Sequence, residues 1–193
     1  MRRPLYFLLL VVCGIVLDQL TKSLAFSQIP LEHTRPVIDG IFHFSPVHNK
    51  GVAFSLGAKY PLLIKGFTIC AVIGLAVWYA ITWRSASKLL IVALAFLLSG
   101  AIGNLIDRML FDYVLDFLDF RPELPVIGHW AIFNVADIFI CVGVGLLVLE
   151  SLWPEPKPTL SPAPVSGVSA APPAVAPAPA APSAPPEKHT SGA

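Results

Sequence analysis

Four long apolar segments constrain the fold of this chain more than any other feature of its sequence. Each approaches the length of about 20 residues that a helix needs to cross the hydrocarbon core of a bilayer. Only 13% of the residues are charged, whereas a soluble domain carries about 25%. We therefore predict an α-helical integral membrane protein with four transmembrane helices. The predicted spans are residues 5–26, 61–83, 89–106 and 130–153.

The start of the first span is typical of a secretory signal peptide, because Arg2 and Arg3 precede an apolar run. No small-residue cleavage site follows that run, which leads into Asp18 and Lys22 instead, so we expect a retained span. Four spans place both termini on one side of the membrane. The two arginines and the basic connection between the second and third spans predict that this side is the cytoplasm.

Two longer loops then lie on the outer side, at residues 27–60 and 107–129. Within the first loop, residues 38–44 are rich in strand-forming side chains after a turn signal, and residues 47–54 continue this pattern. We therefore predict a small β-sheet on the outer membrane face.

The last 40 residues differ in composition from the rest of the chain. Residues 154–193 hold 12 of the 19 prolines and are otherwise mostly Ala, Ser and Val. Such a segment cannot build a packed core. We predict that residues 1–153 form the membrane domain and that the remainder is a disordered cytoplasmic tail.

Two sets of polar residues lie on single helix faces. Asp18 and Lys22 are four residues apart, and they can either ease the end of the first span as an ion pair or support a functional site. Gly100, Asn104 and Arg108 recur every four residues, which is compatible with helix packing beside a snorkelling arginine or with a functional site. We expect Asn104 just inside the membrane and Arg108 at its edge. The carboxylate at position 107 lies off this face, and we expect it to meet solvent.

Asp137 carries the strongest functional signal of any single residue. If the fourth span begins near residue 130, this carboxylate lies about seven residues along the helix, or roughly 10 Å. Asn134 lies one turn earlier, and no basic residue lies within reach along the helix. Intramembrane acids so often mark function that we favour a functional partner over the alternative, a protonated side chain bonded to a helix carbonyl.

Asp116 is the natural partner of Asp137, because it lies between the third and fourth spans with apolar neighbours in the sequence. Asp112 and Asp119 compete for this role, and spacing does not choose among the three. Two carboxylates at short range cannot both ionise and would share one proton. The ionised member could deprotonate a water while the protonated one polarises a carbonyl. This pairing predicts peptide hydrolysis.

Composition disfavours several other functions. The histidines form neither HxxxH nor HExxH and the cysteines form no CxxC pair, so we expect no metal and no cofactor. The net charge of +1 gives no electrostatic reason to bind nucleic acid. A proton-coupled carrier with Asp18, Arg108 and Asp137 along a polar path stays possible, although the chain has no internal repeat. So does a non-catalytic membrane scaffold.

Five motifs in chain order resemble the lipoprotein signal peptidase family (signal peptidase II), which are aspartic peptidases of the bacterial inner membrane. The resemblance runs from about Pro4 to Trp153. Each motif alone is weak, but five in order together with four spans are highly specific. The motifs are Asp18-Gln-Leu-Thr-Lys22, Asn49-Lys-Gly51-Val-Ala53-Phe54-Ser55, Gly100-Ala-Ile-Gly103-Asn104-Leu-Ile-Asp-Arg108, Val114-Leu-Asp116-Phe117 and Phe133-Asn134-Val-Ala136-Asp137.

The resemblance implies an endopeptidase that cuts prolipoproteins just before the lipobox cysteine, after that cysteine has received a diacylglyceryl group. It implies Asp116 and Asp137 as the catalytic dyad, a choice that spacing could not make. Asp18 and Lys22 would support the fold near the site, and the loop sheet would be a periplasmic cradle for the substrate. We expect the enzyme to act as a monomer among membrane lipids, with its active site near the periplasmic face. The residues that would shape the pocket and hold the substrate backbone are Asn49, Gly51, Asn104, Arg108 and Asn134.

Overall fold

The computed structural model describes residues 2–51, 57–121 and 130–152. Within these ranges four helices are long and apolar enough to span a membrane, which confirms the predicted four-span fold. The predicted tail at residues 154–193 lies outside the described residues. The helices are α1 (Arg2–Gln28), α2 (Pro61–Thr82), α3 (Lys88–Phe111) and α4 (Val135–Leu152).

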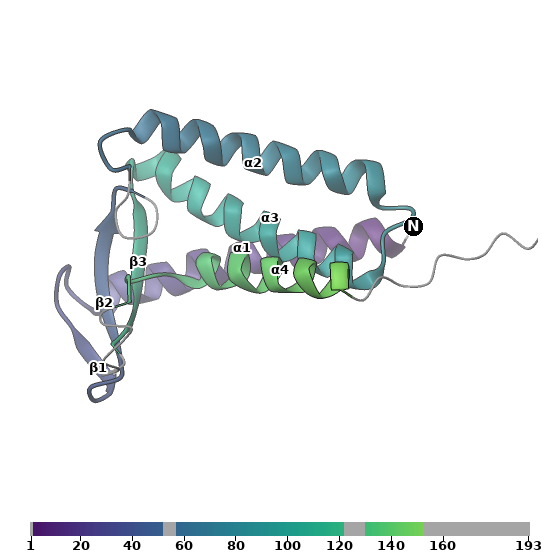
Figure 1. Ribbon diagram of the computed structural model, residues 1–193. Coiled ribbons are helices and arrows are strands. Elements are labelled where there is room, and N and C mark those ends of the chain that lie inside the picture. Colours follow the sequence, from purple (N-terminus) through teal and green to yellow (C-terminus); the bar gives the residue numbers. More distant parts are fainter. Residues whose placement is uncertain (1, 52–56, 122–129, 153–193) are drawn as a thin grey trace, which may run out of the picture. The chain divides into compact units, whose positions relative to one another are not determined.

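The helices run beside one another, and a small sheet lies across one end of them (Figure 1). We call this end of the bundle the sheet end. α1 and α3 finish there, whereas α2 and α4 begin there. The first residues of the chain lie at the opposite end (Figure 1).

α3 is the helix against which the other three pack. Two of its glycines allow neighbouring segments to approach closely. A Cβ atom at Gly100 would collide with the carbonyl oxygen of Ala136 and lie 2.8 Å from the side chain of Ile140. A Cβ atom at Gly103 would lie 2.5 Å from the Asp18 carboxylate. These two glycines therefore bring α1, α3 and the start of α4 together.

The start of α4 differs from the prediction, which placed it near residue 130. The helix begins at Val135, because Phe133 is occupied in a β-bridge to Leu118. The next residue, Asn134, caps the helix by accepting the backbone N–H of Asp137. Asp137 therefore lies in the first turn of α4, and the predicted depth of seven residues was wrong.

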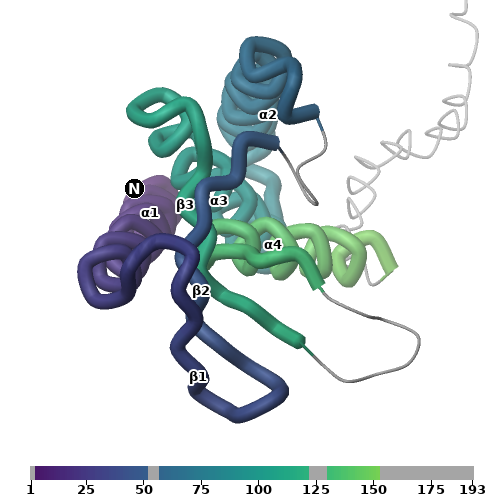
Figure 2. The backbone as a smooth tube through the Cα atoms, turned by 90° about the vertical axis from the view of Figure 1, so that its left-hand side faces the viewer, coloured from purple at the N-terminus to yellow at the C-terminus, as the bar shows by residue number. Residues whose placement is uncertain are grey.

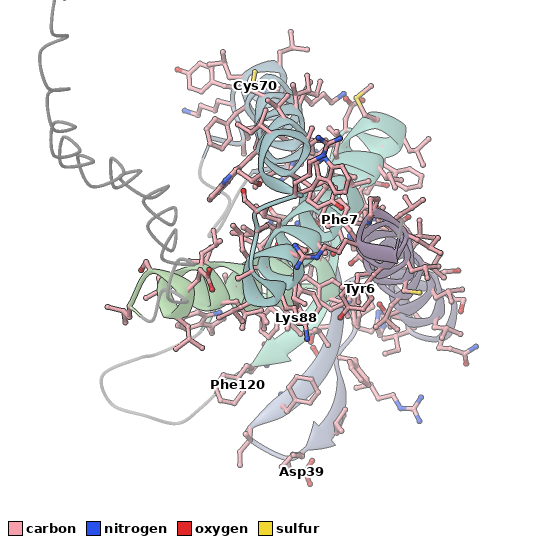
Figure 3. The ribbon with its side chains drawn as sticks, turned by 90° about the vertical axis from the view of Figure 1, so that its right-hand side faces the viewer. Tyr6, Phe7, Asp39, Cys70, Lys88 and Phe120 are labelled. Atoms are coloured by element: carbon pink, nitrogen blue, oxygen red, sulfur yellow. The ribbon has the colours of Figure 1, made fainter. Side chains whose placement is uncertain are left out.

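The sheet is antiparallel, and its strands lie in the order β1 (Arg35–Ile38), β2 (Phe42–Asn49) and β3 (Val114–Phe120) (Figure 2). One predicted strand, at residues 38–44, instead contains a turn, because Gly40 takes a positive φ of 72° and separates β1 from β2. Asp39 marks the tip of this hairpin in Figure 3. β3 comes from the second long loop, for which no strand was predicted.

Replacing Gly100 with alanine should lower the thermal unfolding temperature, because the added methyl group has no space between α3 and α4. Overpacking of this kind costs about 1–3 kcal/mol. The matched control is Gly145→Ala in α4, where an added Cβ meets nothing within 4 Å. We expect the control to be neutral or slightly stabilising through its better helix propensity. Equal unfolding temperatures for the two variants would contradict the close packing at Gly100.

Candidate active site

Asp116 and Asp137 both bind one asparagine at the sheet end. The side-chain Nδ2 of Asn134 donates to Asp116 Oδ1 over 2.6 Å. Its Oδ1 accepts the backbone N–H of Asp137 over 3.0 Å, and Asp137 Oδ2 accepts the backbone N–H of Asn134 over 3.1 Å. The reciprocal pair is a capping box at the start of α4. Asn134 therefore holds the acid of β3 and the acid of α4 at one place.

Two further amides bind the two acids. Asn104 of α3 donates to Asp137 Oδ1 over 2.8 Å, and Asn49 at the end of β2 donates to Asp116 Oδ2 over 2.8 Å. Asn104 Oδ1 in turn accepts from Asn134 over 3.0 Å. All four carboxylate oxygens thus accept a hydrogen bond, which fixes the direction in which each acid points.

Arg108 of α3 binds the backbone of Gly51, two residues after β2, beside these acids. Its Nη2 donates to the carbonyl oxygen of Gly51 over 3.1 Å, and its Nη1 donates to the carbonyl oxygen of Asn104 over 3.3 Å. The backbone N–H of Gly51 donates to Asn49 Oδ1 over 2.9 Å, which makes a tight Asx-type bend just after β2. These contacts hold Asn49 in position to bind Asp116.

Lys22 lies at the centre of a buried network between α1 and α3. Its Nζ lies 2.8 Å from Asp18, 2.7 Å from Asp107 and 3.2 Å from Asn104 Oδ1. The side chain is only 1% exposed. The three partners satisfy the three N–H donors of the ammonium group. Through Asn104, this network reaches Asp137.

We predicted that the Asp107 side chain meets solvent. This was wrong, because the side chain is fully buried. α3 continues past residue 106 to Phe111, so this carboxylate stays within the helix packing. It binds Lys22, the Nε2 of Gln19 (3.0 Å) and the backbone N–H of Leu115 (3.1 Å). Gln19 was not predicted as part of this cluster, although it lies three residues before Lys22 and so shares its helix face.

Asp18 joins α1 to the start of α4. Its Oδ1 accepts the backbone N–H of Ala136 over 2.9 Å, next to Asp137. The first N–H groups of a helix have no partner within the helix and attract a carboxylate. Asp18 therefore positions the turn of α4 that carries Asp137, in addition to binding Lys22.

Asp116 has an unusual electrostatic environment. Its side chain is 1% exposed. Burial first, and then the charge of Asp137, raise its pKa from the ordinary value of 3.8 to about 7, against the opposing effect of the hydrogen bonds from Asn49 and Asn134. A carboxyl group of this kind holds a proton near neutral pH, as expected of one member of an acid pair.

The competing acids Asp112 and Asp119 bind other partners. Burial alone would raise the pKa of Asp119, but hydrogen bonds from Arg121 and Ser45 outweigh it, so the pKa lies below its usual value. Asp112 is mostly exposed and forms an ion pair with Lys65 over 2.5 Å. Neither contact is with the cluster that contains Asp116 and Asp137. Among the described residues, no group of three His, Cys, Asp or Glu side chains could hold a metal ion.

Comparison with known proteins finds similarity over most of the chain. A family model described as signal peptidase (SPase) II matches residues 10–153. A lipoprotein signal peptidase of Syntrophus aciditrophicus (strain SB) is 41% identical over 160 residues, and the match covers 79% of this chain and 96% of that protein. A lipoprotein signal peptidase of Geobacter sulfurreducens is 40% identical over 158 residues, with 79% and 96% covered.

A solved structure shares the fold. It is a bacterial membrane enzyme determined by the in meso method at 2.3 Å resolution, and it is 28% identical to this chain. The two structures match with a TM-score of 0.68, over 76% of this chain and 87% of the other. The similarity in sequence and in structure therefore extends over most of the membrane-spanning region.

Proposed function

The chain belongs to the signal peptidase II family, and we propose that it is an aspartic endopeptidase that removes signal peptides from prolipoproteins. The observation that carries this proposal is the convergence of Asp116 and Asp137 on Asn134. Lipoprotein signal peptidases among the relatives support prolipoproteins as the substrates. The proposed cut lies just before the lipobox cysteine that carries the diacylglyceryl group.

In the proposed mechanism, the two acids divide the proton transfers between them. Asp137 is the ionised member, since the start of a helix favours negative charge, and it takes a proton from the attacking water. Asp116 is the protonated member and donates to the carbonyl oxygen of the scissile bond. When the tetrahedral intermediate collapses, Asp116 recovers its proton and the proton on Asp137 passes to the leaving amine. No covalent intermediate with the enzyme forms.

The surrounding residues have positioning roles in this proposal. Asn49, Asn104 and Asn134 orient the two acids, and Arg108 with Gly51 holds the loop that would lie along the substrate backbone. Asp18 supports the site by binding the start of α4, and Lys22 supports it by binding Asp18. We propose that the enzyme acts as a monomer among membrane lipids of the bacterial inner membrane, with both termini in the cytoplasm and the sheet end facing the periplasm.

The direct test uses the full-length protein in lipid vesicles with a prolipoprotein whose lipobox cysteine carries a diacylglyceryl group. Mass spectrometry should find a signal peptide and a mature chain that begins with the modified cysteine. The same precursor without the lipid should be cleaved much more slowly. If the modified precursor stays intact, or is cut at another bond, the proposed function is wrong.

The rate of cleavage should fall as the pH rises above about 7. Asp116 must hold its proton to polarise the carbonyl, and its pKa is about 7. Above this value kcat/KM should decrease roughly tenfold for each pH unit. A pH–rate profile of the wild-type protein tests this, and a rate that stays constant from pH 7 to pH 9 would contradict the role given to Asp116.

The stability of the folded protein should also depend on the protonation of Asp116. Folding raises the pKa of Asp116 from 3.8 to about 7, so the folded protein binds this proton more tightly than the unfolded chain. The resulting stabilisation is fully present below pH about 4 and is lost as the pH rises through about 7. The decrease in unfolding temperature between pH 5 and pH 8 should therefore be smaller in Asp116→Asn than in the wild-type protein.

A further inference from the structure

α2 is the least buried of the four helices, since none of its residues, all of which are described, is buried. The half of α2 that lies away from the sheet is nevertheless well fixed. The ring of Tyr79 stacks on Phe7 of α1 with a centroid distance of 3.5 Å, and Figure 3 shows Phe7 at this junction. Just after the helix, Arg3 donates to the carbonyl oxygens of Arg84 and Ala86.

Among the described residues, the hydrophobic core cluster reaches α2 only at Val72, Leu75 and Tyr79, so the half at the sheet end has less apolar packing. Leu62, Leu63 and Phe67 are each at least 70% exposed. A polar contact joins this half to α3, because Nζ of Lys65 lies 2.5 Å from Oδ1 of Asp112. Lys65 is 20% exposed and Asp112 is 79% exposed, so the pair lies at the surface of the bundle.

Asp112 has a backbone conformation that does not favour a side chain. It caps the end of α3 with a φ of 69° and a ψ of 4°, in the left-handed region. Glycine takes this conformation without steric cost, whereas a residue with a Cβ atom is sterically strained in it. The side chain at this position is the one that binds Lys65. The ion pair therefore gives a reason for an aspartate at this cap.

The cap lies at the corner where α3 ends and β3 begins, at residues 111–114. β3 carries Asp116, only four residues after Asp112. Asp107 holds the same corner from inside the bundle, since its Oδ2 accepts the backbone N–H of Leu115. The corner thus has a buried attachment to the network of Lys22 and an exposed attachment to α2.

We propose that the Lys65–Asp112 ion pair is a positioning contact for the substrate, because it fixes the sheet-end half of α2 to the corner from which the strand of the dyad begins. The inference rests on the proposed function. The pair keeps the distance between α2 and β3 constant while the apolar signal helix of the substrate is bound beside them. Its loss widens the range of spacings without changing the contacts of either catalytic acid.

The kinetic test compares Lys65→Met, Asp112→Asn and the double variant in lipid vesicles with the lipid-modified precursor. Asparagine tolerates the left-handed conformation, so Asp112→Asn removes the charge and little else. We expect KM to rise about threefold in each single variant, as for the loss of an exposed ion pair, with kcat unchanged. The KM of the double variant should equal that of each single variant, because either substitution alone already removes the whole ion pair. Lys59→Met, which removes an exposed lysine just before α2, should change neither constant.

A further variant separates positioning from stability. Asp112→Gly relieves the left-handed cap, so its unfolding temperature should equal or exceed that of the wild-type protein. Its KM should still rise as in Asp112→Asn. An unchanged KM in Lys65→Met and Asp112→Asn, additive effects in the double variant, or a lowered unfolding temperature together with a raised KM in Asp112→Gly would each overturn the proposal.

A distance measurement tests the tether without using peptidase activity. Spin labels are attached at Leu62 of α2 and Leu110 of α3, both exposed, after the exposed cysteines Cys13, Cys70 and Cys141 have been replaced by serine. We expect a narrow distance distribution, which broadens when Lys65→Met is added. An equally narrow distribution in both proteins would reject the tether even if cleavage is confirmed. A protein that shows the broadening but cleaves no prolipoprotein would instead reject the proposed function.

Discussion

Replacing Asp116 or Asp137 with asparagine is expected to slow cleavage of a lipid-modified prolipoprotein by about 10³-fold or more. Asparagine keeps the size of each side chain but can neither take a proton from water nor share one with its partner. Each new amide oxygen can still accept one of the hydrogen bonds that now reach the carboxylate, so the fold should be retained. Single-turnover rates, together with the unfolding temperature of each variant, measure the two effects separately.

The matched control for this experiment is Asp119→Asn in the same strand. Asp119 lies three residues after Asp116 and is also buried, but it binds Arg121 and Ser45 on a different part of the sheet. We expect Asp119→Asn to be less stable and to retain a kcat close to that of the wild-type protein. A catalytically active Asp116→Asn beside an inactive Asp119→Asn would show that the dyad has been assigned to the wrong acid.

The four spans could be predicted because the length of an apolar segment is a local property of the sequence. The start of α4 could not, since it depends on a backbone pairing between Phe133 and Leu118, which lie in different segments of the chain. The turn could have been predicted from Gly40 itself, but the strand-forming residues on both sides of it indicated one continuous strand. The third strand forms on β2. Its apolar residues are interrupted by Asp116 and Asp119 without a strict alternation of apolar and polar side chains, so its own sequence gave no clear strand pattern.

The candidate site shows the same division between local and long-range information. Helical spacing correctly placed Asp18 and Lys22 on one face, because residues four apart are neighbours within a helix. It could not show that Lys22 also binds Asp107, since that contact depends on how α1 and α3 pack. Spacing also could not decide between Asp116 and Asp112. Asp116 binds Asn134 at the start of α4, whereas Asp112 binds Lys65 of α2, and both contacts depend on how distant segments pack.

Replacing Lys22 with methionine should produce the largest loss of stability of any single change considered for this protein. Methionine fills much of the space of the lysine side chain, but Asp18 and Asp107 would stay fully buried without the ammonium group that lies 2.8 Å and 2.7 Å from them. Removing one partner from a buried ionic network costs about 3–5 kcal/mol. For a chain of this size, such a cost lowers the unfolding temperature by roughly 10 °C.

The control for Lys22→Met is Lys65→Met, which breaks an ion pair of similar length whose aspartate is exposed. An exposed pair contributes about 1 kcal/mol or less, so the control should lower the unfolding temperature by no more than about 4 °C. Adding Asp107→Asn to Lys22→Met should recover part of the loss, because one of the two unpaired carboxylates is then removed. Equal unfolding temperatures for Lys22→Met and Lys65→Met would mean that the network around Lys22 is hydrated, and that Asp18 does not need this lysine to hold the start of α4.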